Sequence, residues 1–82
     1  MDLVKIAERL DAEEQLKLKY KTPVAIGGSW QSPIVRMDKL LDVEPERDTL
    51  FVSFRGEAIW IRIDEALEVL PDDGVYGEAT DH

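Results

Sequence analysis

Residues that usually carry out catalysis are scarce in this 82-residue chain. It contains no cysteine, which excludes a thiol nucleophile, a disulfide framework and a thiolate zinc site. A serine nucleophile needs a neighbouring base, and the single histidine is His82, the last residue, where nothing would hold it in place. With 18 carboxylates, contacts between pairs are expected by chance, so no acid–base pair can be nominated. We therefore expect no catalytic residues and no enzymatic activity.

Acidic residues at every second position form the best candidate for a metal site. They are Asp42, Glu44, Glu46 and Asp48, and this alternation is similar to the spacing of oxygen ligands in calcium-binding loops. The segment lacks the central glycine and the terminal bidentate glutamate of such loops, and Pro45 stiffens it. The pattern favours a solvated acidic turn, and we expect no metal ion and no cofactor.

Three of the five lysines, Lys17, Lys19 and Lys21, alternate along one stretch. If this stretch is a strand, they project from one face about 7 Å apart. Such a stripe could bind an anion or a phosphate, which makes it a secondary candidate site. The same pattern is typical of an edge strand, where lysine discourages pairing between sheets, and of a solvated face that balances nearby acids. The last two interpretations are favoured.

A surface that mixes aromatic and arginine side chains is the strongest binding candidate. Phe51, Arg55, Trp60 and Arg62 are predicted to share one face of residues 51–62. Such residues are enriched at protein interfaces, and they also stack nucleic-acid bases. Alternatively, the N-terminal helix covers Phe51 and Trp60 and leaves the arginines at its margin.

These side chains are positioned by a β-hairpin that the sequence predicts over residues 50–55 and 58–63. A glycine followed by Glu57 fits a type II′ turn, because Gly56 tolerates the positive φ of the first turn position. The opposite face of the hairpin is then wholly apolar, and it must form the core because a one-residue slip would expose it. This face comprises Leu50, Val52, Phe54, Ile59, Ile61 and Ile63.

Periodicity predicts the elements before the hairpin. A helix over residues 2–14, with Asp2 as its N-cap, packs Leu3, Ile6 or Leu10 against the hairpin. A strand over residues 16–26 is favoured over a helix that continues to residue 20. Residues 27–29 predict a turn and residues 34–37 a short strand, while residues 38–43 are compatible with a strand or a helical turn.

The chain after the hairpin is predicted to be helical and then irregular. Asp64 caps a short helix over residues 65–70, and residues 72–82 form a frayed polar tail. The whole chain is predicted to be one α+β domain with four or five mostly antiparallel strands. The sheet is either open or curled into a small SH3-like barrel.

The net charge of −8 and the pI near 4.5 favour solubility and oppose non-specific binding to nucleic acid. We see no secretory signal and no apolar run of about 18 residues, so we expect a cytoplasmic protein with no membrane partner. The leading hypothesis is a non-catalytic regulatory domain that occupies the surface of a protein partner, for which a basic one is a candidate. The alternatives are an acidic nucleic-acid mimic that blocks a basic groove, and a single-strand binder that uses Phe51, Trp60 and the arginines. Self-association is left open.

Overall fold

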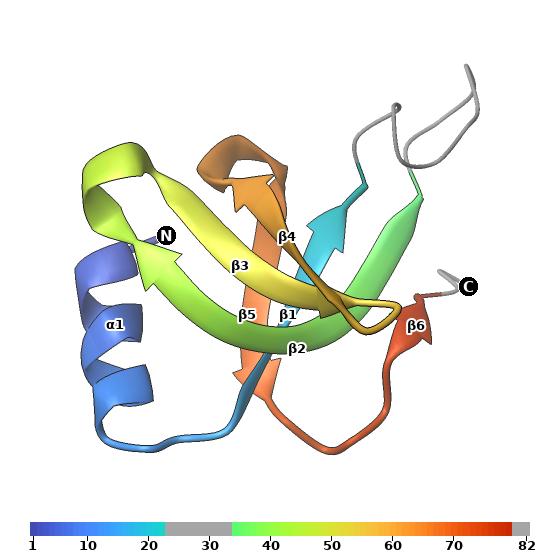
Figure 1. Ribbon diagram of the computed structural model, residues 1–82, viewed down its shortest axis with the longest axis horizontal. Helices are drawn as coiled ribbons and strands as arrows, with labels where there is room; N and C mark the ends of the chain where they lie inside the picture. Colours follow the sequence, from blue (N-terminus) through green and yellow to red (C-terminus); the bar gives the residue numbers. More distant parts are fainter. Residues whose placement is uncertain (23–33, 80–82) are drawn as a thin grey trace.

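The computed structural model describes residues 1–22 and 34–79, and shows one N-terminal helix beside a six-stranded sheet (Figure 1). All strand pairings in these residues are antiparallel, so the predicted α+β class is confirmed. The turn expected at residues 27–29 and the terminal His82 lie outside the described residues. In chain order the elements are α1 Leu3–Asp11, β1 Leu16–Lys21, β2 Val35–Glu44, the 3-10 helix η1 Pro45–Arg47, β3 Thr49–Phe54, β4 Glu57–Arg62, the 3-10 helix η2 Ile63–Glu65, β5 Ala66–Pro71 and β6 Gly77–Glu78.

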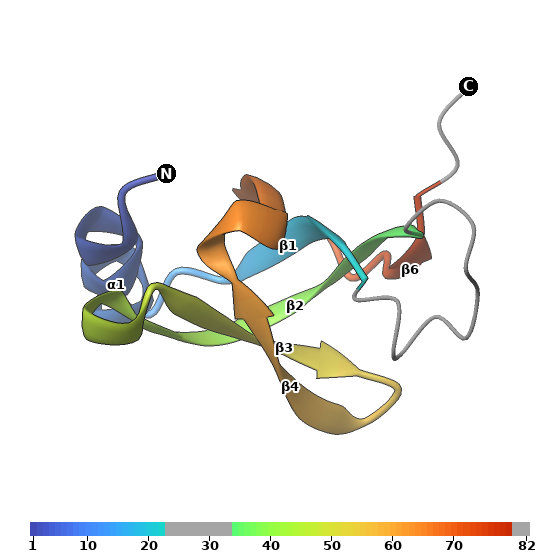
Figure 2. The ribbon, with the colours of Figure 1, turned by 90° about the horizontal axis from the view of Figure 1, so that it is seen from above.

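The sheet has the strand order β4-β3-β2-β1-β5, and β6 pairs with the first part of β2. Although β4 and β5 are consecutive strands, they occupy opposite edges, and no pairing joins them within the described residues. Closure into a barrel would require backbone hydrogen bonds between these edges. The SH3-like barrel, the second of the two expected arrangements, is therefore not formed. Figure 2 shows α1 and β6 at opposite ends of the molecule.

The β3–β4 hairpin forms where the sequence predicts it, but its turn lies one residue earlier. Arg55 and Gly56 occupy the two turn positions with φ of 51° and 84°, which defines a type I′ turn rather than type II′. Each β3 residue therefore faces a β4 residue two positions earlier than expected, for example Leu50 opposite Ile61. Because this shift is even, the apolar and mixed faces are unchanged.

The core lies between the β3–β4 hairpin and the strands β1 and β5 behind it (Figure 1). Leu50, Val52 and Ile61 are buried together with Leu3 and Ile6 of α1, as predicted. The other predicted core residues, Leu10, Ile59 and Ile63, are partly buried against this cluster. Phe54 is half-buried, and the guanidinium carbons of Arg36 and Arg55 lie 4.7 and 5.1 Å from its ring centroid.

The helix α1 begins as predicted and ends three residues early. Asp2 Oδ1 accepts hydrogen bonds from the backbone N–H groups of Val4 and Lys5, at 3.1 and 3.3 Å. At the other end, Glu13 N–H donates to Leu10 and Glu14 N–H donates to Arg9, which is a Schellman motif. Glu13 has the left-handed φ of 63° that this motif usually assigns to glycine. No helix in the described ranges is long and apolar enough to span a membrane.

We expect Glu13→Gly to stabilise the protein by about 0.5–1 kcal/mol, because glycine adopts the left-handed conformation without steric cost. The matched control is Glu8→Gly, which also removes one exposed acid but places glycine in the interior of α1 and should destabilise by about 0.5–1 kcal/mol. Urea denaturation measures both changes. Equal effects of the two variants would contradict strain at residue 13.

The two strands predicted before the hairpin are observed with other bounds. The strand from residue 16 is confirmed over β1, against a helix that continues to Tyr20; it ends at Lys21, and residues 23–26 of the predicted strand lie outside the described residues. Residues 38–43 are strand throughout, because β2 continues to Glu44 along β3. A β-bulge at Leu41 lets β2 pair with β1 in its first part and with β3 in its second.

The short helix predicted over residues 65–70 is wrong. Residues 63–65 form η2, and the chain then continues as β5, which pairs along β1 from Leu16 to Tyr20. Long-range pairing with β1 overrides the local helical pattern here. Residues 72–79, expected to fray, instead form a hydrogen-bonded turn and β6, which pairs with Arg36 and Met37 of β2.

Candidate protein-binding surface

An aromatic pair, of which Trp60 is exposed and Phe51 half-buried, lies on the outer face of the β3–β4 hairpin. Phe51 and Trp60 are directly opposite each other across the two strands, with ring centroids 3.9 Å apart and an interplanar angle of 49°. Trp60 remains 45% exposed despite this contact. The contact with Phe51 restricts the indole, so a large apolar group has a defined position at the surface.

Leu41 is the third apolar residue of this surface. The bulge sets Leu40 opposite Val52 and Asp42 opposite Phe51, so Leu41 and Asp42 both face outward while Leu40 and Val43 are buried. Leu41 is 44% exposed. We call Leu41, Phe51 and Trp60 the aromatic patch. The alternation of β2 does not predict Leu41 here; the sole signal in the sequence is two adjacent leucines in a strand.

The helix α1 does not cover the aromatic patch. Leu3 and Ile6 join the buried cluster with Leu50 and Ile61, whose side chains point to the face opposite Phe51 and Trp60. The alternative in which the N-terminal helix buries these aromatics is therefore wrong. Both faces of the hairpin carry apolar residues, and α1 packs against the inner face.

The two arginines predicted for this face are placed differently. Arg62 lies on the outer face, two residues after Trp60, and its Nε is 3.6 Å from Asp64 Oδ1. Arg55 occupies the turn, where its guanidinium lies over Phe54 rather than beside Trp60. Of the four predicted residues, the structure thus brings Phe51 and Trp60 into contact and separates Arg55 from them.

The predicted lysine stripe is interrupted at its first member. The side chain of Lys17 is 6% exposed, and its Nζ donates to Asp73 Oδ1 at 2.8 Å and to the carbonyl of Val75 at 3.2 Å. This hydrogen bond lowers the pKa of Asp73 below its ordinary value. Lys21 is exposed and Lys19 is half-buried. Because β1 pairs with β2 on one side and β5 on the other, protection of an edge strand does not explain these lysines.

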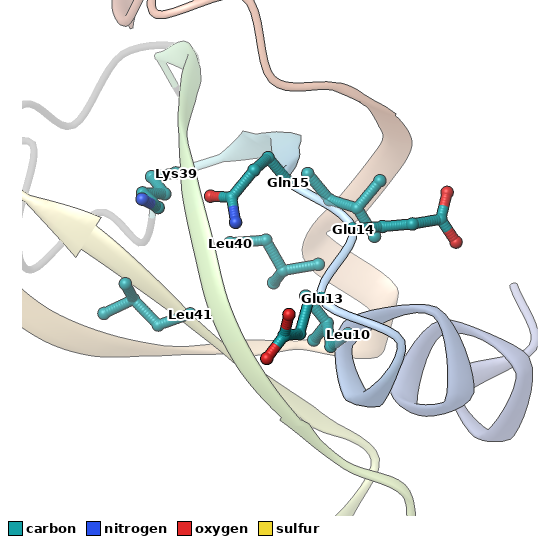
Figure 3. A pocket seen from close by; sticks show the side chains of 8 residues that line it. Leu10, Glu13, Glu14, Gln15, Lys39, Leu40 and Leu41 are labelled. Carbon is teal, nitrogen blue, oxygen red and sulfur yellow. The ribbon is translucent and has the colours of Figure 1, made fainter.

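A hollow of about 470 Å³ adjoins the aromatic patch where α1 leads into β1 (Figure 3). Leucines contributed by α1, β1 and β2 line it, and Leu41 belongs to both the hollow and the patch. Glu13 lies at its rim, whereas Glu14 is paired with Arg9, 3.2 Å from its Nε. The surface beside the patch therefore mixes leucine side chains with polar and charged ones. The residues lining the hollow are Leu10, Glu13, Glu14, Gln15, Leu16, Lys39, Leu40 and Leu41.

A network of three polar side chains lies inside the protein, and it was not predicted from the sequence. The Tyr20 hydroxyl donates to buried Asp38, which also accepts bonds from Arg36 Nε at 3.0 Å and Nη2 at 3.2 Å. Burial raises the pKa of Tyr20, and the hydrogen bond to Asp38 adds to the effect. The same carboxylate raises the pKa of Arg36. The three groups satisfy one another, which indicates a structural role.

The alternating acidic side chains from Asp42 to Asp48 do not form one cluster that could bind a metal ion. Asp42 Oδ1 accepts from the backbone N–H of Val43, and Glu44 lies 3.6 Å from Arg47. In residues 1–22 and 34–79, no group of three or more acidic, histidine or cysteine side chains could hold a metal ion.

Comparison of this chain with protein-family models, with curated proteins and with solved structures finds no match.

Proposed function

We propose that this protein is a non-catalytic, acidic binding domain that acts by occupying a surface of a basic protein partner through the aromatic patch. The observation that carries the proposal is Trp60, which contacts the Phe51 ring and is still 45% exposed on the hairpin. Tryptophan is strongly enriched among residues that dominate binding energy at protein interfaces. The contact with Phe51 reduces the conformational entropy that Trp60 loses on binding.

Charge supports the choice of a basic partner. The net charge of −8 attracts cationic surfaces over long distances and accelerates association at low ionic strength. Asp42 and Glu13 carry negative charge at the margin of the aromatic patch. An apolar centre with a charged rim is the usual organisation of a protein interface.

A protein partner is preferred over single-stranded nucleic acid. Base stacking on Phe51 and Trp60 would require nearby cations to hold the phosphates. Lys17 is buried in its ion pair with Asp73, and Arg55 lies in the hairpin turn. Arg62 lies on the same face as Trp60, but Asp64 is 3.6 Å from it and offsets its charge. An acidic mimic of nucleic acid would also bind a basic protein, and competition by duplex DNA or RNA for the same partner would distinguish that mechanism.

We expect Trp60→Ala to weaken partner binding by 2 kcal/mol or more, roughly 30-fold in affinity, as hot-spot residues do. Stability should fall by less than about 3 kcal/mol, the lower end of the range for a fully buried tryptophan, because the Trp60 side chain is 45% exposed. The partner is first purified by capture on the immobilised full chain, and calorimetric titration with thermal denaturation then measures both quantities.

A matched pair of leucines tests whether the effect belongs to the aromatic patch. Leu41 and Leu67 are 44% and 42% exposed, and Leu67 lies on β5, away from the patch. Leu41→Ala should weaken binding, whereas Leu67→Ala should not. Equal affinities for wild type and Trp60→Ala would refute the proposed surface, as would tight binding of the wild type to single-stranded DNA or RNA.

A further inference from the structure

The outer edge of β4 is an unprotected strand edge. In the part of the chain that the structure describes, β4 pairs with β3 alone. Soluble proteins usually protect such edges with lysine, proline or a bulge. The other edge strand, β5, has Pro71 and an irregular register along β1, but β4 has none of these features and its six pairs with β3 are continuous. Its central residues 58–61 are all apolar.

Within residues 1–22 and 34–79, the backbone of β4 has hydrogen-bonding groups without a partner at two central positions. A two-residue turn makes Phe54 and Glu57 a hydrogen-bonded pair, and every second pair along the hairpin is of the same type. Ala58 and Trp60 therefore direct their N–H and C=O groups away from β3. Arg62 has the same orientation, but its N–H already donates to Glu65 Oε1 at 3.3 Å. The groups at Ala58 and Trp60 match a further antiparallel strand.

We propose that the occupant of this edge is β4 of a second copy of this chain, related by a two-fold axis through Ile59. In this register Ala58 of each copy faces Trp60 of the other, and these two residues use all their outward backbone groups. A small residue opposite a large one avoids a clash between the two indoles. The Arg62–Glu65 bond is kept, and such an isologous contact closes at two copies.

Dimerisation would extend the binding surface of the protein. The two sheets become continuous, and the aromatic patches of both copies lie on the same outer face, on either side of the axis. A partner would then contact two Trp60 side chains at once, with the gain that bivalent contacts give. This arrangement goes beyond the proposed function and does not depend on it.

Salt separates self-association from binding to a basic partner. Two copies that each carry −8 repel one another, and salt screens this repulsion. Sedimentation equilibrium of the full chain, up to about 1 mM as suits a small interface, should show a dimer that is tighter at about 0.5 M than at about 0.05 M NaCl. Partner binding should show the opposite salt dependence. A chain that stays monomeric under all these conditions refutes the dimer.

Two sets of variants test the register. Ala58→Pro removes an outward N–H without breaking a bond to β3 and should weaken the dimer at least about tenfold, whereas Ala58→Ser should not. Circular dichroism checks that both fold. Because the chain has no cysteine, Ile59→Cys places a single thiol at the two-fold axis, and it should form an intermolecular disulfide much faster than Leu67→Cys on the other edge. Equal oxidation rates, or an Ala58→Pro dimer of unchanged affinity, refute this edge.

The dimer and the proposed function fail separately. If the chain stays monomeric and Trp60→Ala still lowers its affinity for the partner, the proposed function stands and the dimer is refuted. If the chain forms a dimer that salt strengthens, but Trp60→Ala leaves the partner affinity unchanged, the dimer stands and the proposed function is refuted. If Ala58→Pro abolishes partner binding in a chain that is always monomeric, the edge accepts a strand of the partner, and the second copy is refuted as its occupant.

Discussion

Replacement of Asp38 with alanine is expected to lower the free energy of unfolding by about 3–5 kcal/mol. Asp38 is 2% exposed and bonds both Tyr20 and Arg36, so its removal takes a hydrogen-bond acceptor from the phenol and the counter-charge from a largely buried guanidinium. The cost of an unpaired buried charge exceeds the strength of the lost contact itself. Denaturation in urea measures the change. An unaltered m-value would show that the wild type and the variant expose the same amount of surface on unfolding.

The matched control for Asp38 is Asp64, which also pairs with an arginine. Asp64 and Arg62 are exposed, so Asp64→Ala should change stability by about 0–1 kcal/mol. Tyr20→Phe should cost about 1 kcal/mol, because it removes one hydrogen bond and leaves Asp38 paired with Arg36. A loss below about 1 kcal/mol for Asp38→Ala would mean that water reaches the site and replaces the carboxylate.

Ile61→Ala should destabilise the protein by about 2–5 kcal/mol, the usual range for removal of a large buried aliphatic side chain. Ile61 is completely buried opposite Leu50, in the cluster that α1 joins through Leu3 and Ile6. Because the surrounding strands cannot close the space fully, a cavity adds to the lost transfer energy. Urea denaturation of this variant provides the measurement.

A graded series at the same position provides the control. Ile61→Val removes one methylene and should cost about 0.5–1.5 kcal/mol. Trp60→Ala, one residue earlier and on the outer face, should cost less than Ile61→Ala although the side chain removed is larger. The reverse order at these neighbouring positions would mean that the two faces of β4 are exchanged.

The aromatic patch was predictable in part. Strict alternation over residues 50–63 determines which side chains share a face, so Phe51 and Trp60 could be placed together without coordinates. The alternation could not show which face of the hairpin α1 packs against, because both faces carry apolar residues. Leu41 was not predictable, since a bulge depends on how β2 passes from β1 to β3.

Local signals in the sequence determined the elements that depend on neighbours in the chain. Alternation determined the two faces of the hairpin, a side-chain oxygen at Asp2 determined the start of α1, and Gly56 determined that a turn with positive φ occurs there. Each of these features is set by residues within a few positions of one another. These interactions form between neighbouring residues and require no contact with a distant segment, so they leave a recognisable pattern in the sequence.

Contacts between distant segments decided the rest. Pairing with β1 converted the predicted C-terminal helix into β5, and the resulting central position of β1 buried Lys17 beneath the turn that carries Asp73. The network of Tyr20, Asp38 and Arg36 likewise depends on the register between β1 and β2. A side chain's burial depends on which strands lie beside it, and pairing between strands far apart in the chain leaves no periodic signal in either one. The tertiary structure alone therefore decided which charged residues are internal and which sheet edge remains open.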